Sequence, residues 1–300
     1  MQKPASRLTV ADFDQELLIL FDAYVHGDID RRGFLERARR FAVGGLTAAG
    51  LLAALSPEFA QAQQVAPDDA GLRSEAIHID SPAGHGRLSG YLCRPAQASG
   101  PLPAVLVVHE NRGLNPHIED VTRRLALQGY LALAPDALHP LGGYPGDEDK
   151  ARALFAQLDQ DRTRQDMLAA ANALQRHPGS NGRLGVVGFC WGGGIAHWLA
   201  ARLPQLAAAV PFYGNHPAAE DAARVSAPLL IHFADVDDRI NSAWPAYEAA
   251  LKAAGARYTA YRYPGTQHGF HNDTTPRYDQ AAARLAWQRT LDFLARQLKG

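Results

Sequence analysis

The chain has 300 residues, of which 47% are hydrophobic and 20% are charged, and its formal net charge is -1. This composition describes a soluble globular protein of one or two domains, and the near-zero charge excludes a broad electrostatic attraction to nucleic acid or to an anionic membrane. Two cysteines without a CxxC pair exclude a disulfide framework. The histidines show no HExxH or paired Cys/His spacing, so we expect neither a metal nor a cofactor.

The first part of the chain has the order of an export signal. A charged region with the adjacent Arg31 and Arg32 precedes the weakly apolar run 41–55, and the small-residue site Ala60-Gln61-Ala62 follows. The arginine pair followed by Gly-Phe-Leu resembles the twin-arginine signal of proteins that fold before export. The apolar run is shorter than the roughly 20 residues that span a bilayer, so we expect no permanent membrane anchor.

Two interpretations of this segment stay open. If it is an export signal, residues 1–62 are a leader, residues 63–300 are the catalytic domain, and the protein works in the periplasm. The alternative is a retained helical arm in a cytoplasmic protein, packed on the core or on a second subunit. This alternative is supported by helical apolar spacing in residues 12–27, at Phe13, Leu17, Leu20 and Tyr24.

From residue 75 onward, strand patterns alternate with helix patterns. Residues 76–80 and 88–93 flank a turn and predict a hairpin. Apolar runs predict strands at 104–110, 130–136, 183–189, 207–214, 228–234 and 257–264, and helical patterns predict helices at 116–128, 147–177 (two helices), 191–202, 243–254 and 277–298. This order predicts an α/β fold with a mostly parallel sheet and helices on both faces. Ligands of such sheets bind at the carboxyl ends of the strands.

Cys190 follows one of these strands in the segment GVVGFCWGGG. The residues Gly188 to Gly192 fit G-x-C-x-G, the thiol form of a nucleophile elbow, in which glycines make room where strand and helix nearly collide. We expect the cysteine to have a strained backbone conformation and an exposed side chain. The amide end of the following helix favours its thiolate. The alternative is an inert, buried cysteine. A disulfide from Cys190 to Cys93 is not expected, because a strand residue and a turn residue rarely meet its geometry.

The later strand ends supply an acid and a base. Asp235, Asp237 and Asp238 follow the strand at 228–234, and His268 follows the last strand. Nucleophile, acid and histidine in this chain order, each after a strand, is the arrangement of α/β-hydrolases. The three side chains therefore predict a nucleophilic triad.

These segments resemble the dienelactone hydrolase (carboxymethylenebutenolidase) family over about residues 75–298. The likeness is carried by VVHENRGLNPHIEDVTRRLALQGYLALAPD, GVVGFCWGGG, LLIHFADVDD and YPGTQHGF. The resemblance implies Cys190 as nucleophile, His268 as base and Asp237 as the orienting acid. Asp235 and Asp238 are alternatives for the acid.

The residues near the elbow have further expected roles. We expect the backbone N–H groups of Trp191 and Asn111 to bind the oxyanion of a tetrahedral intermediate. The resemblance implies that Glu110 lies near the thiol and takes part in its resting protonation. The alternative for Glu110 is a structural carboxylate paired with Arg112 or with a backbone amide.

The resemblance fails at the residues that bind the substrate. Pro140 and Asn272 stand near the positions where the family has arginines for its substrate's carboxylate. Arg112, Arg239 or Arg277 could substitute, and Tyr213 could line the pocket. We therefore expect a Cys-His-Asp hydrolase of small esters or lactones, with the true substrate and a homodimer left open. The alternatives are an acyl transferase with the same triad and a non-catalytic binding or scaffold protein.

Overall fold

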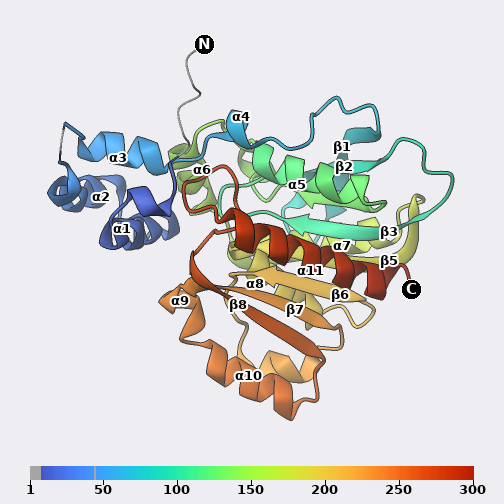
Figure 1. Ribbon diagram of the computed structural model, residues 1–300. Coiled ribbons are helices and arrows are strands. Elements are labelled where there is room, and N and C mark those ends of the chain that lie inside the picture. Colours follow the sequence, from blue (N-terminus) through green and yellow to red (C-terminus); the bar gives the residue numbers. More distant parts are fainter. Residues whose placement is uncertain (1–7, 44) are drawn as a thin grey trace.

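The computed structural model describes residues 8–43 and 45–300. Its centre is one eight-stranded sheet in the order β1-β2-β4-β3-β5-β6-β7-β8 (Figure 1). The strands are β1 (Leu72–Ser81), β2 (Gly86–Pro95), β3 (Leu102–Val108), β4 (Leu131–Pro135), β5 (Ser180–Phe189), β6 (Ala208–Phe212), β7 (Leu229–Val236) and β8 (Tyr258–Gln267). β1 and β2 form the predicted antiparallel hairpin, β2 also pairs antiparallel with β4, and β3 to β8 are parallel. The predicted α/β sheet is confirmed.

Helices connect the strands. The α-helices of this part are α5 (Pro116–Leu127), α6 (Glu148–Phe155), α7 (Gln160–Gln175), α8 (Trp191–Ala200), α9 (Asp238–Asn241), α10 (Trp244–Ala253) and α11 (Gln280–Leu298). Short 3-10 helices lie at Val10–Asp12, Arg39–Phe41, His139–Leu141 and Ala219–Arg224. The segment predicted to contain two helices holds α6 and α7, and the other predicted helices begin and end within a few residues of the observed ones.

Alternate residues of the strands face opposite sides of the sheet. On β3, Leu106 and Val108 belong to an apolar cluster that also takes residues from α7, α8 and α10. Val105 and Val107 of the same strand belong to a second cluster, which takes residues from α5 and α11. Strands with apolar residues on both faces are buried between two helical layers. We call the part of the chain from β1 to α11, residues 72–298, the body. It is a three-layer α/β structure, as the apolar runs predict.

The N-terminal segment folds into a group of helices at one end of the molecule (Figure 1). The group contains α1 (Gln15–His26), α2 (Arg31–Ala38) and α3 (Ala48–Leu55), and the short α4 (Phe59–Ala62) follows it and contacts α5. α1, α2 and α3 share a separate apolar cluster, which includes Leu17, Phe21 and Phe34. Asp14 caps the start of α1, and Gly27 ends it in the left-handed conformation (φ 88). The helix predicted from residues 12–27 is confirmed. We call α1, α2 and α3 the arm.

The segments of the predicted export signal have helical structure. Arg31 begins α2, the run 41–55 contains α3, and Ala60-Gln61-Ala62 falls in α4, although the side chains of Ala60 and Gln61 lie outside the described residues. Export, cleavage and the boundary at residue 62 stay predictions. In residues 8–43 and 45–300, every helix is too short or too polar to cross a membrane.

Candidate active site

Cys190 stands at the sharp turn between β5 and α8. Its backbone has φ 54 and ψ -114, a conformation that L-residues rarely adopt. A Cβ on Gly188 would lie 1.9 Å from the carbonyl oxygen of Gly192, and a Cβ on Gly192 would lie 2.2 Å from that of Val108. Only glycine fits at both places, so the predicted strained elbow is confirmed. The expectation of an exposed side chain is wrong: Cys190 is only 6% exposed, because His26, the last residue of α1, lies against its sulfur. Both cysteines are free thiols.

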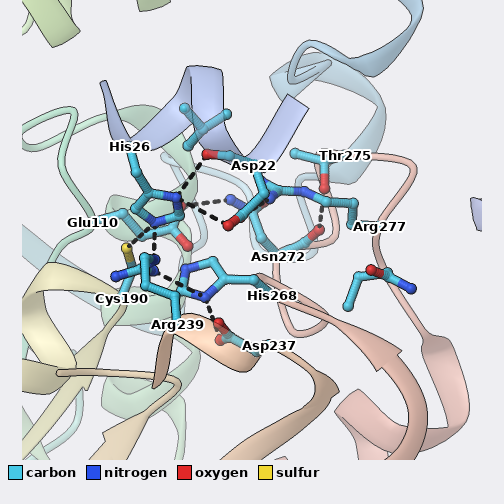
Figure 2. A network of polar contacts seen from close by, with 12 residues as sticks. Asp22, His26, Glu110, Cys190, Asp237, Arg239, His268, Asn272, Thr275 and Arg277 are labelled. Carbon is cyan, nitrogen blue, oxygen red and sulfur yellow. Dashed lines mark hydrogen bonds and ion pairs between the residues drawn. The ribbon is translucent and has the colours of Figure 1, made fainter. Parts of the chain in front are cut away.

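Asp237 and His268 meet beside this cysteine. Asp237 follows β7 and His268 follows β8, and His268 Nδ1 lies 2.6 Å from Asp237 Oδ2 (Figure 2). Both side chains are buried. The other candidate acids lie elsewhere: Asp235 accepts a hydrogen bond from the backbone N–H of Gly265, and Asp238 is exposed at the start of α9. The geometry therefore selects Asp237 as the partner of His268, leaving His268 Nε2 without a hydrogen-bond partner among the described residues.

A second histidine reaches the thiol from the arm. His26, the last residue of α1, places Nε2 3.4 Å from Cys190 Sγ (Figure 2). Its Nδ1 lies 2.8 Å from the backbone oxygen of Asp22 and 3.3 Å from Asp22 Oδ2. The rings of His26 and His268 make an edge contact with centroids 4.6 Å apart. The imidazoles of His26 and His268, each close to an aspartate carboxylate, therefore both lie near the sulfur of Cys190.

Sequence reasoning missed His26. No motif surrounds it, and the only available signal was that Asp22 and His26 are four residues apart on a predicted helix, which places them on one face.

The two imidazoles change the acidity of the thiol. Burial raises the pKa of Cys190, but the charges of His268 and His26 and the hydrogen bond to His26 outweigh it and lower the pKa from 9.0 to about 6. Burial opposes the charged form of His268, yet the charges of Cys190 and Asp237 raise its pKa to about 10. The pKa of His26 is also raised, because the Cys190 charge and the Asp22 hydrogen bond outweigh burial. A thiolate beside imidazolium is therefore favoured near neutral pH.

The predicted substitute arginines have different surroundings. Arg239 is exposed, with Nη2 2.8 Å from His26 Nε2 and Nη1 3.1 Å from Asn215 Oδ1. Arg277 is buried and lies 3.2 Å from Asp22 Oδ1, while Arg112 is buried with Nε 3.4 Å from Glu148 Oε2. Arg112 and Arg277 thus have partners on the arm or the body, and Arg239 alone of the three lines the cavity at Cys190.

Glu110 has a partner that the sequence analysis did not name. Asn272 Nδ2 donates to Glu110 Oε2 at 2.9 Å, and the backbone and hydroxyl of Thr274 donate to Asn272 Oδ1. The expected alternative pairing of Glu110 with Arg112 is not observed, because Arg112 turns to Glu148. Asn272 therefore orients the Glu110 carboxylate, and the expected role of Glu110 in protonation of the thiol stays a prediction.

A cavity of about 530 Å³ opens at Cys190. Its lining includes Trp191, Tyr213, Arg239, Arg152 and His26. Tyr213, also in a positive-φ conformation (φ 36), lies with its ring 4.9 Å from that of His268. Tyr213 thus lies at the cavity as expected. Arg112 instead lines a separate cavity of about 40 Å³, together with Phe21 and Tyr24 of the arm. Asn111, an expected oxyanion donor through its backbone, also lines the larger cavity.

The donor atoms of His26, Cys190 and His268 all lie within 4.8 Å of one another. Sulfur and imidazole nitrogen can also bind soft metal ions. In this structure His26 Nε2 also lies 2.8 Å from Arg239 Nη2. The expectation that this chain holds no metal stays a prediction.

Comparisons with known proteins agree with this fold. A model described as "Dienelactone hydrolase family" matches residues 88–298, and one described as "YqhI-like" matches residues 5–44. A "Putative carboxymethylenebutenolidase" of Escherichia coli O157:H7 is 36% identical over 76% of this chain and 88% of its own length. The "Putative hydrolase fragment YghX" of Escherichia coli K12 is 55% identical over 38% of this chain and 97% of the fragment.

A solved structure agrees as well. The structure described as a putative dienelactone hydrolase from Klebsiella pneumoniae has 34% identity and a TM-score of 0.66, and the match covers 74% of this chain and 99% of that one. The family model covers β3 to β8 together with Cys190, Asp237 and His268, and the relative and the solved structure each match about three quarters of the chain. The chain therefore belongs to the dienelactone hydrolase family, and it is a hydrolase of the α/β-hydrolase fold.

Proposed function

We propose that this protein hydrolyses small carboxylic esters or lactones through a Cys190-His268-Asp237 triad. The observation that carries the proposal is the strained thiol at the elbow beside an imidazole whose other nitrogen lies 2.6 Å from a buried carboxylate. A carboxylate in this place fixes the tautomer and orientation of the histidine. A non-catalytic scaffold has no use for a strained thiol whose pKa is lowered to about 6.

The reaction has two halves. The Cys190 thiolate attacks the carbonyl carbon, and the electron pair of the carbonyl moves to its oxygen. The tetrahedral intermediate then expels the alcohol oxygen, which takes a proton from His268, and an acyl thioester remains on the sulfur. In the second half, His268 takes a proton from water, the hydroxide attacks the thioester carbonyl, and the carboxylic acid leaves as the thiolate re-forms. With a lactone, the alcohol stays attached to the acyl group.

The oxyanion of both intermediates needs hydrogen-bond donors. We assign this role to the backbone N–H groups of Trp191, the first residue of α8, and Asn111, after β3. The amide end of α8 adds a partial positive charge at the same place. One such donor contributes about 3 to 4 kcal/mol to transition-state stabilisation.

The substrate class follows from the cavity and the relatives. A cavity of about 530 Å³ suits a small ester or lactone. A relative from Bradyrhizobium, 34% identical over 72% of this chain, is described as a probable 2-oxo-3-(5-oxofuran-2-ylidene)propanoate lactonase. Pro140 and Asn272 replace the expected carboxylate-binding arginines. We propose that Arg239, exposed at the cavity, is the cation that meets any acidic group of the substrate.

A panel of activated aryl esters and lactones tests the proposal. Wild-type protein should turn over members of the panel, and Cys190→Ala should lose turnover by about 10⁴-fold or more. Cys93→Ala is the matched control, because Cys93 is the second free thiol, is buried in β2, and has a pKa that burial raises to about 11.

Mass spectrometry during turnover should detect the acyl group on the peptide that contains Cys190. Full activity of Cys190→Ala would exclude the mechanism. Transfer of the acyl group to an added alcohol in preference to water would identify an acyl transferase.

A further inference from the structure

The end of α1 is fixed to the catalytic body directly above the elbow. The backbone oxygen of Val25 accepts hydrogen bonds from Asn111 Nδ2 at 3.0 Å and from both terminal nitrogens of Arg112 at 3.3 Å. The backbone oxygen of Tyr24 accepts one from Arg152 at 3.2 Å. The last carbonyls of a helix lack partners within the helix and carry partial negative charge. Two arginines of the body, Arg112 and Arg152, donate to these oxygens and bring positive charge to the end of the helix.

A side-chain contact fixes the preceding turn of α1. Arg277 Nη1 lies 3.2 Å from Asp22 Oδ1, and the Arg277 guanidinium also lies over the ring of Phe21 at 5.2 Å. Arg277 follows β8 on the same segment as His268 and is itself buried. The body therefore holds both Asp22 and the end of the helix that carries His26.

This docking aims His26 at the sulfur. Its Nδ1 lies 2.8 Å from the backbone oxygen of Asp22, which can only accept, so Nδ1 carries a proton. Nε2 then faces Cys190 Sγ at 3.4 Å (Figure 2), and a donor atom of each of His26, Cys190 and His268 lies within 4.8 Å of the other two. A proton on Nε2 would make His26 an imidazolium that donates to the thiolate.

We propose that His26, carried into the catalytic centre by the arm and backed by Asp22, is a second imidazole partner of Cys190 that stabilises its thiolate in the free enzyme. His268 is then left to move protons to and from the reacting groups. The proposal rests on the proposed function in one respect, the role of Cys190 as nucleophile. It also makes the arm part of the enzyme, so that the active protein retains α1.

Several charged groups surround the two partners. His26 faces Asp22 on its own helix, Cys190 at the elbow, His268 after β8 and Arg239 in α9. Glu110 and Arg112 after β3, Arg152 of α6 and Arg277 are the next charged groups. Arg239 donates to His26 Nε2 while that nitrogen has no proton. Because Arg239 is exposed, its side chain can leave as His26 becomes charged.

Titration of the Cys190 thiol tests the proposal without any substrate. The full chain with Cys93→Ala has one thiol, whose ionisation is followed by ultraviolet absorbance and by the pH dependence of its alkylation by iodoacetamide. In this background the thiol pKa should be near 6. His26→Ala and His26→Gln should each raise it by about one unit or more, because an opposite charge at this distance shifts a pKa by about 1 to 3 units.

Two variants and a control separate the imidazole from the packing of the arm. His26→Gln keeps a side chain of similar size without the charge, and His78→Gln makes the same change at an exposed histidine of β1. Thermal unfolding shows which variants are folded. An unchanged thiol pKa in folded His26→Gln would overturn the proposal, whether or not His26→Ala shifts it. Failure of the proposed function is a separate result, since that is read from turnover by Cys190→Ala.

The N-terminus of the active protein gives an independent test. Intact-mass measurement of the protein purified from its native cells should place the start of the chain before α1. Fully active protein that begins near Gln63 would overturn the role of His26.

Discussion

Two acid–imidazole pairs approach Cys190 from different regions of the molecule, and they are built differently. In the body, Asp237 and His268 come from the ends of neighbouring strands, with 2.6 Å between them and exposed side-chain fractions of 1% and 4%. In the arm, Asp22 and His26 are one turn apart on α1, with 3.3 Å between them and exposed fractions of 24% and 9%.

The difference indicates a division of labour. A short contact buried on two adjacent strands holds its histidine in one orientation, as proton transfer requires. A longer, partly exposed contact on a helix with its own apolar cluster tolerates movement, and its charge can still act on the sulfur. We therefore expect loss of the body pair to stop the chemistry and loss of the arm pair to weaken it.

Removal of the body's imidazole should have the largest effect. His268→Ala takes away the only group proposed to donate and accept protons in both halves of the reaction, and we expect kcat/KM to fall by about 10⁴-fold or more. Steady-state kinetics with the best ester of the panel measures this, with His78→Ala as the control at an exposed histidine. If His268→Ala lost only as much activity as His26→Ala, the two pairs would be equivalent and the division of labour would be wrong.

Asp237→Asn should have the next largest effect. The amide keeps the shape of the side chain but can present a donor to Nδ1, which favours the wrong tautomer of His268, and we expect kcat to fall by about 10³- to 10⁴-fold. The measurement is kcat at saturating ester. Asp235→Asn is the matched control, because the Asp235 carboxylate accepts from the backbone N–H of Gly265, whereas that of Asp237 pairs with His268. A larger loss in Asp235→Asn would reassign the acid.

The body pair could be predicted from the sequence because each member is marked locally. Apolar runs locate the strands, and parallel strands bring their carboxyl ends to one edge. The elbow requires glycine at Gly188 and Gly192, because a Cβ at either position would lie about 2 Å from a backbone oxygen. The sequence therefore marks the elbow directly. The position of Asp237 among three aspartates needed the resemblance, and the structure agrees with it.

The arm pair could not be predicted in this way. Apolar spacing predicts that α1 exists, but the direction in which a helix docks depends on contacts with distant residues such as Arg112 and Asn111. The same limit applies to the arginines. Arg277 and Arg112 looked equivalent to Arg239 in the sequence, and only the folded chain shows that Arg277 holds Asp22 while Arg239 faces the cavity.

The pH dependence of kcat/KM should reveal the arm pair. The nucleophile must be a thiolate, so activity should rise with pH through about 6, and His268 must keep its proton for the leaving group, so activity should fall above about 10. Loss of His26 should raise the thiol pKa and move the acidic limb upward by about one unit. His26→Gln should therefore lose several-fold more activity at pH 6 than at pH 8. Equal losses at both pH values would indicate a role for His26 unrelated to the thiol.

Asp22→Asn should have the smallest effect. The Asp22 carboxylate raises the pKa of His26, so its loss should leave His26 less often protonated and the thiolate slightly less stable. The backbone oxygen of Asp22, which accepts from His26 Nδ1 at 2.8 Å, remains in the variant and should keep the ring oriented. We expect kcat/KM at pH 6 to fall about two- to threefold, with a smaller upward move of the acidic limb than in His26→Gln. Asp22→Asn in the His26→Gln background should add little, because the charge it acts on is already absent. Full additivity of the two changes would mean that Asp22 acts through Arg277 and the docking of the arm rather than through His26.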